Sequence, residues 1–226
     1  MDHEMLKEAR DERGWTQATL AARLGVSQGY VALLESGRRK PADALRRRLA
    51  RVLQLPATSL PTTAGRSTVD ADALAAELAD LGYPGFSHLR KGRPRRNPGT
   101  LLLDALAAEA LDPRTAEALP WLLLTFPDLD WDWLLPQVKQ RDLQNRLGYV
   151  VSLARNVAHL QGLDVALVLE AREALLERSR LVREDVFGRS SLTDAERRWL
   201  RANRPPDAAH WNILSDLRPE SLVYGA

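Results

Sequence analysis

The chain has 226 residues, 45% of them hydrophobic, and a formal net charge of +2. This length suits two domains better than one, and the apolar content is enough to form buried cores. Cysteine is absent, which excludes a disulfide framework and any zinc site built on thiolates.

The start of the chain and its apolar runs predict a soluble protein of the cytoplasm. The opening residues Met1-Asp2-His3-Glu4 are polar and acidic, with no apolar stretch behind them, so we expect no signal peptide. The apolar run at residues 118–124 is far too short to span a bilayer.

The charge is unevenly distributed along the chain. Residues 1–66 hold 12 Lys and Arg against 7 Asp and Glu, whereas the remainder holds 20 against 23. Five of those 20 cations lie within residues 90–96 alone. The basic residues 1–66 and the basic loop favour a polyanion as their partner. The acidic remainder of the chain is expected to contact a different kind of partner.

Helical spacing and capping residues predict four helices before Pro56. The predicted segments are 5–13, a second helix capped by Thr16, a third over 28–35 capped by Ser27, and a fourth that begins near Ala42 and ends at Pro56. The small side chain of Ala21 allows two short helices to cross closely. Gly25 supplies the turn that sets these helices at a steep angle.

Several short motifs occur at fixed offsets in this segment. They are Thr16-Gln17, Leu20-Ala21, Leu24-Gly25-Val26-Ser27, Leu34-Glu35 and Gly37-Arg38 with Pro41. With them, residues 3–60, about a quarter of the chain, resemble the phage-repressor (Xre-like) helix-turn-helix family. The resemblance implies a five-helix, lambda-repressor-like domain whose third helix lies in the major groove of double-stranded DNA.

Within this resemblance, the expected DNA-binding residues lie at two helix starts and after the third helix. They are Thr16, Gln17, Ser27, Gln28, Gly29, Tyr30, Leu33, Ser36, Arg38, Arg39 and Lys40. Free N–H groups at a helix start favour a phosphate, and Gln17 is expected to bond a phosphate oxygen. The resemblance places Gln28 and Gly29 at the base edges, where a glutamine suits adenine.

The other positions carry weaker expectations. Gly29 departs from the longer polar residue often found there, so one base is expected to be read by shape or through water. Leu33 suits a thymine methyl group. Tyr30 either reaches a phosphate or packs on the surface, and both readings stay open. Ser36 and the three cations after it are expected to face the opposite phosphate strand.

The remaining residues of this segment have structural interpretations. The predicted core is Leu6, Leu20, Ala21, Leu24, Val26, Val31, Leu34, Leu45 and Leu49. Arg10 and Glu35 resemble the internal ion pair of the family. The four arginines Arg46, Arg47, Arg48 and Arg51 form either a solvated helix face or additional contacts to the DNA backbone.

A Pro-, Thr-, Ser- and Gly-rich stretch, residues 61–67, is the predicted linker between domain 1–60 and domain 68–226. The larger domain is predicted to be all-α. Its expected helices are 70–81, 100–111, 113–125, two within 130–160 that break near Pro136 or Arg141, 163–181, and 193–203 with a capping box at Thr193.

Two features of this domain have open interpretations. The loop residues Arg90, Lys91, Arg93, Arg95 and Arg96 form either an arm along the DNA backbone or a flexible solvated loop. The tryptophans, such as those in the stretch 126–133, form either an anchor for a protein partner or the core of the helical domain.

No catalytic, metal or cofactor-binding residues are predicted. The histidines His3, His88, His159 and His210 form no metal-binding pattern, and neither a phosphate-binding glycine loop nor a nucleophile elbow is present. We therefore expect a protein that is not an enzyme and carries no cofactor.

The leading hypothesis is a transcriptional repressor that binds a palindromic operator as a homodimer, because one short helix reads only a few base pairs. The alternative is an antitoxin of a toxin–antitoxin system, which neutralises a partner toxin through the acidic helical body and represses its own operon. A third possibility is a sensor of a small ligand.

Overall fold

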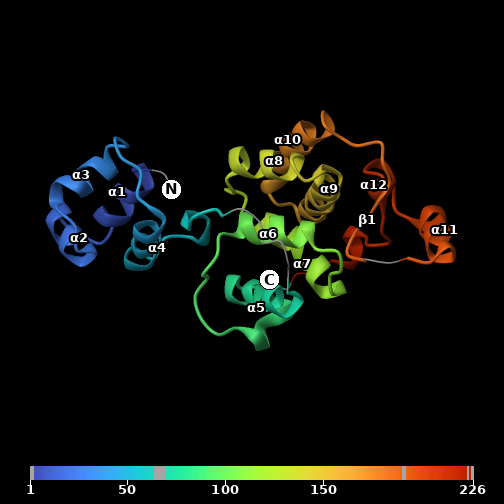
Figure 1. The fold of residues 1–226 in the computed structure, drawn as a ribbon, viewed down its shortest axis with the longest axis horizontal. Coiled ribbons are helices and arrows are strands. Elements are labelled where there is room, and N and C mark those ends of the chain that lie inside the picture. The colour runs from blue at the N-terminus through green and yellow to red at the C-terminus, as the bar shows by residue number, and fades with distance from the viewer. Residues whose placement is uncertain (1–2, 64–69, 190–191, 223, 225–226) are drawn as a thin grey trace. The chain divides into compact units, whose positions relative to one another are not determined.

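The computed structural model describes residues 3–63, 70–189, 192–222 and 224, and this part of the chain is mostly helical with little strand (Figure 1). The prediction of an all-α fold is therefore confirmed. The chain divides into two compact units, Met1–Thr63 with Pro94–Asn97, and Ala64–Arg93 with Pro98–Ala226. Most of the predicted linker at 61–67 lies outside the described residues.

Unit 1 consists of four α-helices and one 3-10 turn, which together make the five expected helical segments. They are α1 (His3–Asp11), α2 (Gln17–Leu24), α3 (Gln28–Glu35), α4 (Asp43–Val52) and η1 (Ala57–Ser59). Helix α4 ends before the expected Pro56, because Gln54 adopts a left-handed φ of 48° and Leu55 N donates to Ala50 O.

The core of unit 1 matches the prediction at most positions. Its buried members are Leu6, Ala9, Leu20, Ala21, Leu24, Val31, Leu34, Leu49 and Leu53, and the predicted Val26 and Leu45 are partly buried against them. Between α2 and α3, Gly25 has a φ of 62° and Val26 N donates to Ala21 O at 3.1 Å. This left-handed turn is one that glycine adopts without strain, and it ends α2 so that α3 can cross it.

Unit 2 is built around one buried helix. Its elements are α5 (Ala71–Leu81), η2 (Pro84–Leu89), α6 (Pro98–Ala107), α7 (Pro113–Thr125), α8 (Trp131–Lys139), α9 (Gln144–Gln161), α10 (Val165–Glu177), β1 (Asp185–Val186), α11 (Asp194–Asn203), α12 (Pro206–His210), β2 (Ile213–Leu214) and η3 (Pro219–Ser221). Helix α9 contacts α7, α8, α10, α12, β2 and η3, so it forms the centre of the unit.

The structure corrects several expected boundaries in unit 2. Of the two expected break points, Pro136 stays inside α8, and the break lies at Arg141 and Asp142, where Asp142 has a left-handed φ of 55°. Helix α6 begins at Pro98 and α10 ends at Glu177, whereas the expected limits were Thr100 and Leu181. The 3-10 segment η2 precedes the basic loop, and the expected capping box at Thr193 is present.

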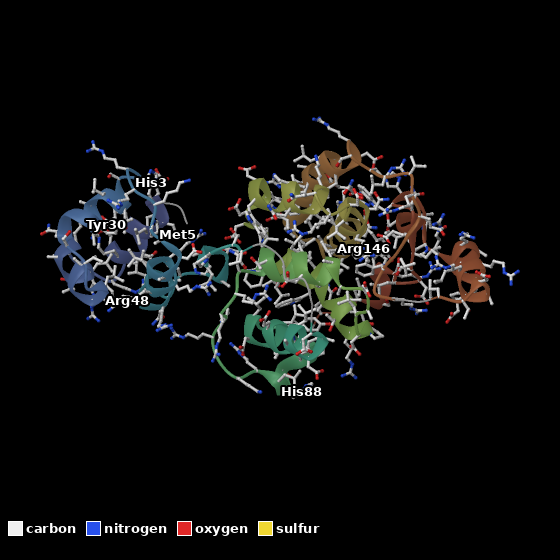
Figure 2. All side chains as sticks on the ribbon, viewed as in Figure 1. His3, Met5, Tyr30, Arg48, His88 and Arg146 are labelled. Atoms are coloured by element: carbon white, nitrogen blue, oxygen red, sulfur yellow. The ribbon has the colours of Figure 1, made fainter. Side chains whose placement is uncertain are left out.

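The sequence did not predict one short sheet. Strands β1 and β2 run parallel, with Asp185 beside Ile213 and Val186 beside Leu214. A strand of two residues is too short to produce an alternating apolar pattern, so the sequence could not predict these two strands. The guanidinium of Arg146, labelled in Figure 2, bonds Asp185 with Nε–Oδ2 at 2.7 Å and holds β1 against the buried helix α9.

Most tryptophans belong to the core of unit 2. Trp121, Trp131 and Trp211 are buried, and Trp133 packs partly buried against the core. Trp199 is different, because its side chain is 55% exposed on α11. The core interpretation of the tryptophans is therefore correct for the buried three and wrong for Trp199.

Gly148 packs directly against a buried tryptophan, which predicts a destabilising effect of one added methyl group. A Cβ atom added at Gly148 of α9 would lie 2.4 Å from the ring of the fully buried Trp211. We expect Gly148→Ala to lower the free energy of unfolding of unit 2 by about 1–3 kcal/mol, the usual cost of overpacking. Urea denaturation followed by far-UV circular dichroism measures it.

Gly92→Ala is the matched control, since nothing lies within 4 Å of the added methyl group. Equal unfolding free energies for the two variants would contradict the tight fit between α9 and Trp211.

Candidate nucleic-acid interface

The amino ends of α2 and α3 are capped in the way the sequence predicts. Thr16 Oγ1 accepts from Thr19 N at 3.1 Å, and Ser27 Oγ accepts from Tyr30 N at 3.2 Å. A capped end still leaves first-turn N–H groups that point along the helix axis and favour an anion. Gln28 and Gly29, the first residues of α3, are both exposed, so this helix end is open to a ligand.

A buried carboxylate joins three helices behind this surface. Glu35, at the last position of α3, accepts from Arg10 of α1 through Nε–Oε1 at 2.6 Å and Nη2–Oε2 at 3.1 Å. It also accepts from Gln17 of α2, with Nε2–Oε2 at 2.9 Å. The side chains of Arg10 and Glu35 are only 8% and 4% exposed. The ion pair that the sequence suggested is therefore present and buried.

Arg10 also closes the loop between α1 and α2. Its Nη1 donates to the carbonyl oxygen of Trp15 at 2.7 Å and pairs with Asp11. The hydrogen bond to Glu35 and the charges of Glu35 and Asp11 outweigh burial and raise the pKa of Arg10 above its ordinary value. Arg10 is therefore held in its charged form beside Glu35.

The bond between Gln17 and Glu35 was not foreseen from the sequence. Gln17 is the first residue of α2 and was expected to face a phosphate. Its amide nitrogen carries two N–H donors, and one of them is directed to Glu35. The same amide keeps its second N–H donor. The bond to Glu35 therefore orients the Gln17 side chain and still leaves one N–H for another partner.

The basic segment after α3 folds back onto the helix. Arg38, Arg39 and Lys40 are exposed, and Arg39 N donates to Leu33 O at 3.1 Å. The guanidinium carbon of Arg39 lies 5.2 Å from the centre of the Tyr30 ring, a cation–π contact. Tyr30 is half-buried, so its surface-packing interpretation is satisfied in the free protein while Arg39 remains exposed.

Three other expected contact residues lie along the same helix. Leu33 is 38% exposed, so its side chain is accessible to a ligand. Nothing lies within 4 Å of a Cβ added at Gly29, so packing does not require glycine at this position. The Ser36 hydroxyl donates to Leu33 O at 3.2 Å and therefore helps to end the helix.

Two arginines of α4 have structural roles. Arg46 Nε donates to Ser59 O at 2.7 Å, and Arg48 Nη2 donates to Arg23 O at 3.3 Å; Arg48 and Tyr30 are labelled in Figure 2. The proposal of a solvated face is thus wrong for Arg46, whereas Arg47, Arg48 and Arg51 are exposed. A long side chain bonded to a distant carbonyl leaves no periodic signal in the sequence.

The basic loop is fixed at both of its ends. Within unit 2, Lys91 N and Gly92 N donate to Asp80 Oδ1 at 2.9 and 3.0 Å. Within unit 1, the buried Asn97 donates through Nδ2 to Thr58 O at 2.9 Å and to Leu60 O at 2.8 Å. The ends of the loop are thus bonded to the rest of the chain, and both interpretations, an arm along DNA and a flexible solvated loop, stay open for the cations between them. Arg90, Lys91, Arg93 and Arg95 are exposed, and Arg96 is half-buried.

Two histidines of unit 2 are paired with carboxylates. His159 and His210 lie beside Glu170 and Glu177 on the surface, with N–O distances of 2.9 and 2.7 Å. No group of three or more His, Asp or Glu in residues 3–63, 70–189, 192–222 and 224 is arranged to hold a metal ion. Among the helices described here, none combines the length and apolarity needed to cross a bilayer.

Residues 6–60 match the family model described as helix-turn-helix. The N-terminal unit is therefore a helix-turn-helix domain of the Xre-like kind, a DNA-binding family of transcription regulators, which agrees with the resemblance drawn from the motifs. The comparison with curated proteins gave no match, and neither did the comparison with solved structures.

The buried ion pair predicts a stability effect. Arg10→Met leaves the Glu35 carboxylate buried with only the Gln17 amide, and we expect unit 1 to lose about 3–5 kcal/mol. Hydrogen exchange at the core amides of α2 and α3 measures this loss. Arg10→Met with Glu35→Met removes both charges and should recover most of it.

Arg13→Met is the control, in the turn that directly follows α1, because Arg13 Nη1 donates only to the backbone oxygen of Ala9 in a single bond at 2.7 Å. We expect it to cost less than about 1.5 kcal/mol. A loss from Arg10→Met no larger than that of the control would show that the ion pair is not needed to hold the three helices together.

Proposed function

We propose that this chain is a transcriptional repressor that binds a specific site on double-stranded DNA, with α3 in the major groove. The observation that carries the proposal is the exposed Gln28 at the start of α3, a helix whose last residue, Glu35, is fixed to α1 and α2 and is followed by three exposed cations. A polar side chain on a fixed helix reads base edges, and cations beside it bind phosphates.

Each exposed group has a place in this proposal. Gln28 bonds an adenine edge, Gly29 leaves room for water or for readout of DNA shape, and Leu33 contacts a thymine methyl group. Thr16, Gln17 and Ser27 bind phosphates at the helix starts. Ser36, Arg38, Arg39 and Lys40 face the opposite strand, together with Tyr30 once Arg39 turns towards DNA.

The repressor acts as a homodimer on a palindromic operator. Helix α3 has eight residues and reads only a few base pairs, so two copies are needed to select one site in a genome. In this proposal residues 1–60 bind DNA and residues 68–226 supply the dimer contacts. The protein acts in the cytoplasm, where a bacterial chromosome is accessible.

The basic loop adds contacts to the DNA backbone. Its cations Arg90, Lys91, Arg93, Arg95 and Arg96 lie just before Asn97, which bonds to Thr58 and Leu60 of unit 1. This anchor supports the arm interpretation, because the last residues of the loop are held to the DNA-binding unit rather than left as a free tether.

A second candidate function is that of an antitoxin, and the exposed Trp199 favours it. Tryptophan is enriched at the hot spots of protein interfaces, and this one is 55% exposed on α11. Co-expression with a neighbouring toxin-like reading frame tests this function. Loss of co-purification in Trp199→Ala would support it, and purification of the regulator alone would count against it.

The base-reading role of Gln28 is testable by one truncation. We expect Gln28→Ala to weaken binding to the selected site by about 1–3 kcal/mol and to leave binding to unrelated duplexes nearly unchanged. Fluorescence anisotropy with both kinds of duplex measures the two affinities.

Gln140→Ala is the matched control, a glutamine of unit 2 that is also exposed. Equal losses on specific and unrelated DNA in Gln28→Ala would mean that the start of α3 is not the base-reading element.

The cations after α3 predict a different signature. Changing Arg38, Arg39 and Lys40 together to Gln should weaken binding to all sequences. The slope of log K against log salt is negative, and this change should reduce its magnitude by about 2–3 per protomer. The control is Arg114, Arg183 and Arg198 changed to Gln, three exposed cations of unit 2 with the same total charge. An unchanged salt slope in the first variant would remove these cations from the interface.

A further inference from the structure

The outer face of α10 is apolar although it is exposed. Leu167 is 71% exposed, Val168 40% and Leu175 37%, and Ala171 between them is exposed as well. Residues four apart lie on one face of a helix, so 167, 171 and 175 form a single stripe. The opposite face, with Leu169 and Leu176, is already buried in unit 2.

The apolar surface continues beyond both ends of this helix. In the described part of the chain, eight large hydrophobic side chains are exposed, and six of them lie between residues 160 and 182. Leu160 and Leu163 precede α10 and are 67% and 40% exposed, and Val182 follows it at 94%. Such a concentration in one short segment is typical of an interaction site rather than of scattered surface residues.

The two ends of the stripe carry opposite charges. Asp164 is the N-cap residue of α10 and Arg178 its C-cap residue, and both are exposed in helical conformation. With 3.6 residues per turn, positions 164, 171 and 178 are seven apart and lie on the same face. The stripe is therefore acidic at one end, apolar in the middle and basic at the other end.

We infer that α10 is the contact through which two copies of this chain form a dimer, with the two helices antiparallel and crossing at Ala171. This register places Asp164 beside the partner subunit's Arg178 and Leu167 beside the partner subunit's Leu175. A parallel pair would bring like charges together at both ends. The small side chain of Ala171 lies at the two-fold axis, where it allows a close approach of the backbones.

The chemistry of the stripe favours a second copy over other partners. In a two-fold interface the same patch of both subunits meets in opposite directions. The patch must therefore be complementary to itself when reversed, as this stripe is. The flanking carboxylates Glu170 and Glu177 bond to His159 and His210 of the same chain. Glu177 also pairs with Arg180, so both carboxylates already have partners within the chain and do not require a basic partner.

This inference rests on the dimer of the proposed function and names its surface. The test is sedimentation of the full chain without DNA, from low to high micromolar concentration. We expect the unmodified chain to be a dimer. Ala171→Glu, which places two carboxylates at the axis, should raise the dimer dissociation constant by about 30-fold or more.

The control for this change is Ala195→Glu, an exposed alanine of α11 that should leave the dimer intact. A charge exchange tests the register itself. Asp164→Arg alone should weaken the dimer by about 5–10-fold, and Asp164→Arg combined with Arg178→Asp should restore it. Far-UV circular dichroism verifies that each variant is folded.

Three outcomes would overturn the inference. They are a monomeric unmodified chain, a dimer that survives Ala171→Glu, and a combined charge variant that stays as weak as Asp164→Arg. If the full chain did not self-associate and instead bound a different cellular protein through α10, that result would also count against a second copy as the partner. The affinity of each variant for a duplex with a single half-site is measured as well. It shows whether unit 1 still binds DNA when the dimer contact through α10 is lost.

Discussion

The buried carboxylate of Glu35 is the constraint on which the DNA-binding unit depends. It accepts hydrogen bonds from Arg10 of α1 and Gln17 of α2 while it ends α3, so three short helices share one charged centre. A buried carboxylate is costly unless donors surround it, and the bidentate guanidinium and the amide supply them. Because α2 and α3 have only eight residues each, neither is stable alone, and their crossing angle must come from such tertiary contacts. The last residue of α3 is therefore fixed to α1 and α2, at the other end of the helix from the exposed Gln28.

The same network connects stability to recognition. Gln17 gives one amide hydrogen to Glu35 and keeps another, so the residue that fixes α2 against α3 is also available to a phosphate. Arg39 covers the ring of Tyr30 in the free protein, and Asn97 joins the end of the basic loop to the carbonyl groups of Thr58 and Leu60. Gln17 and the end of the basic loop are thus oriented without DNA, whereas Arg39 has to leave the Tyr30 ring before both residues can contact DNA.

Local signals predicted the short-range features of this chain well. The caps at Thr16 and Ser27, the turn at Gly25 and the limits of α3 depend on neighbouring residues, and the structure confirms them. Contacts across long sequence separations gave no such signal. The bonds of Asn97 and Arg46, the two-residue strands and the pairing of Gln17 with Glu35 depend on tertiary packing. Pro136 shows the same limit, because a proline signals a break, yet α8 continues past it to the left-handed turn at Asp142.

The two units divide the proposed work, with base reading in unit 1 and self-association through α10 in unit 2. The central claim is that α3 selects a DNA sequence, and selection of bound duplexes from a random library by the full-length protein tests it most directly. The account predicts enrichment of an inverted repeat whose half-sites are centred about 10 base pairs apart or a multiple of that spacing. A library that emerges with no preferred sequence, at an ionic strength where binding persists, would contradict it.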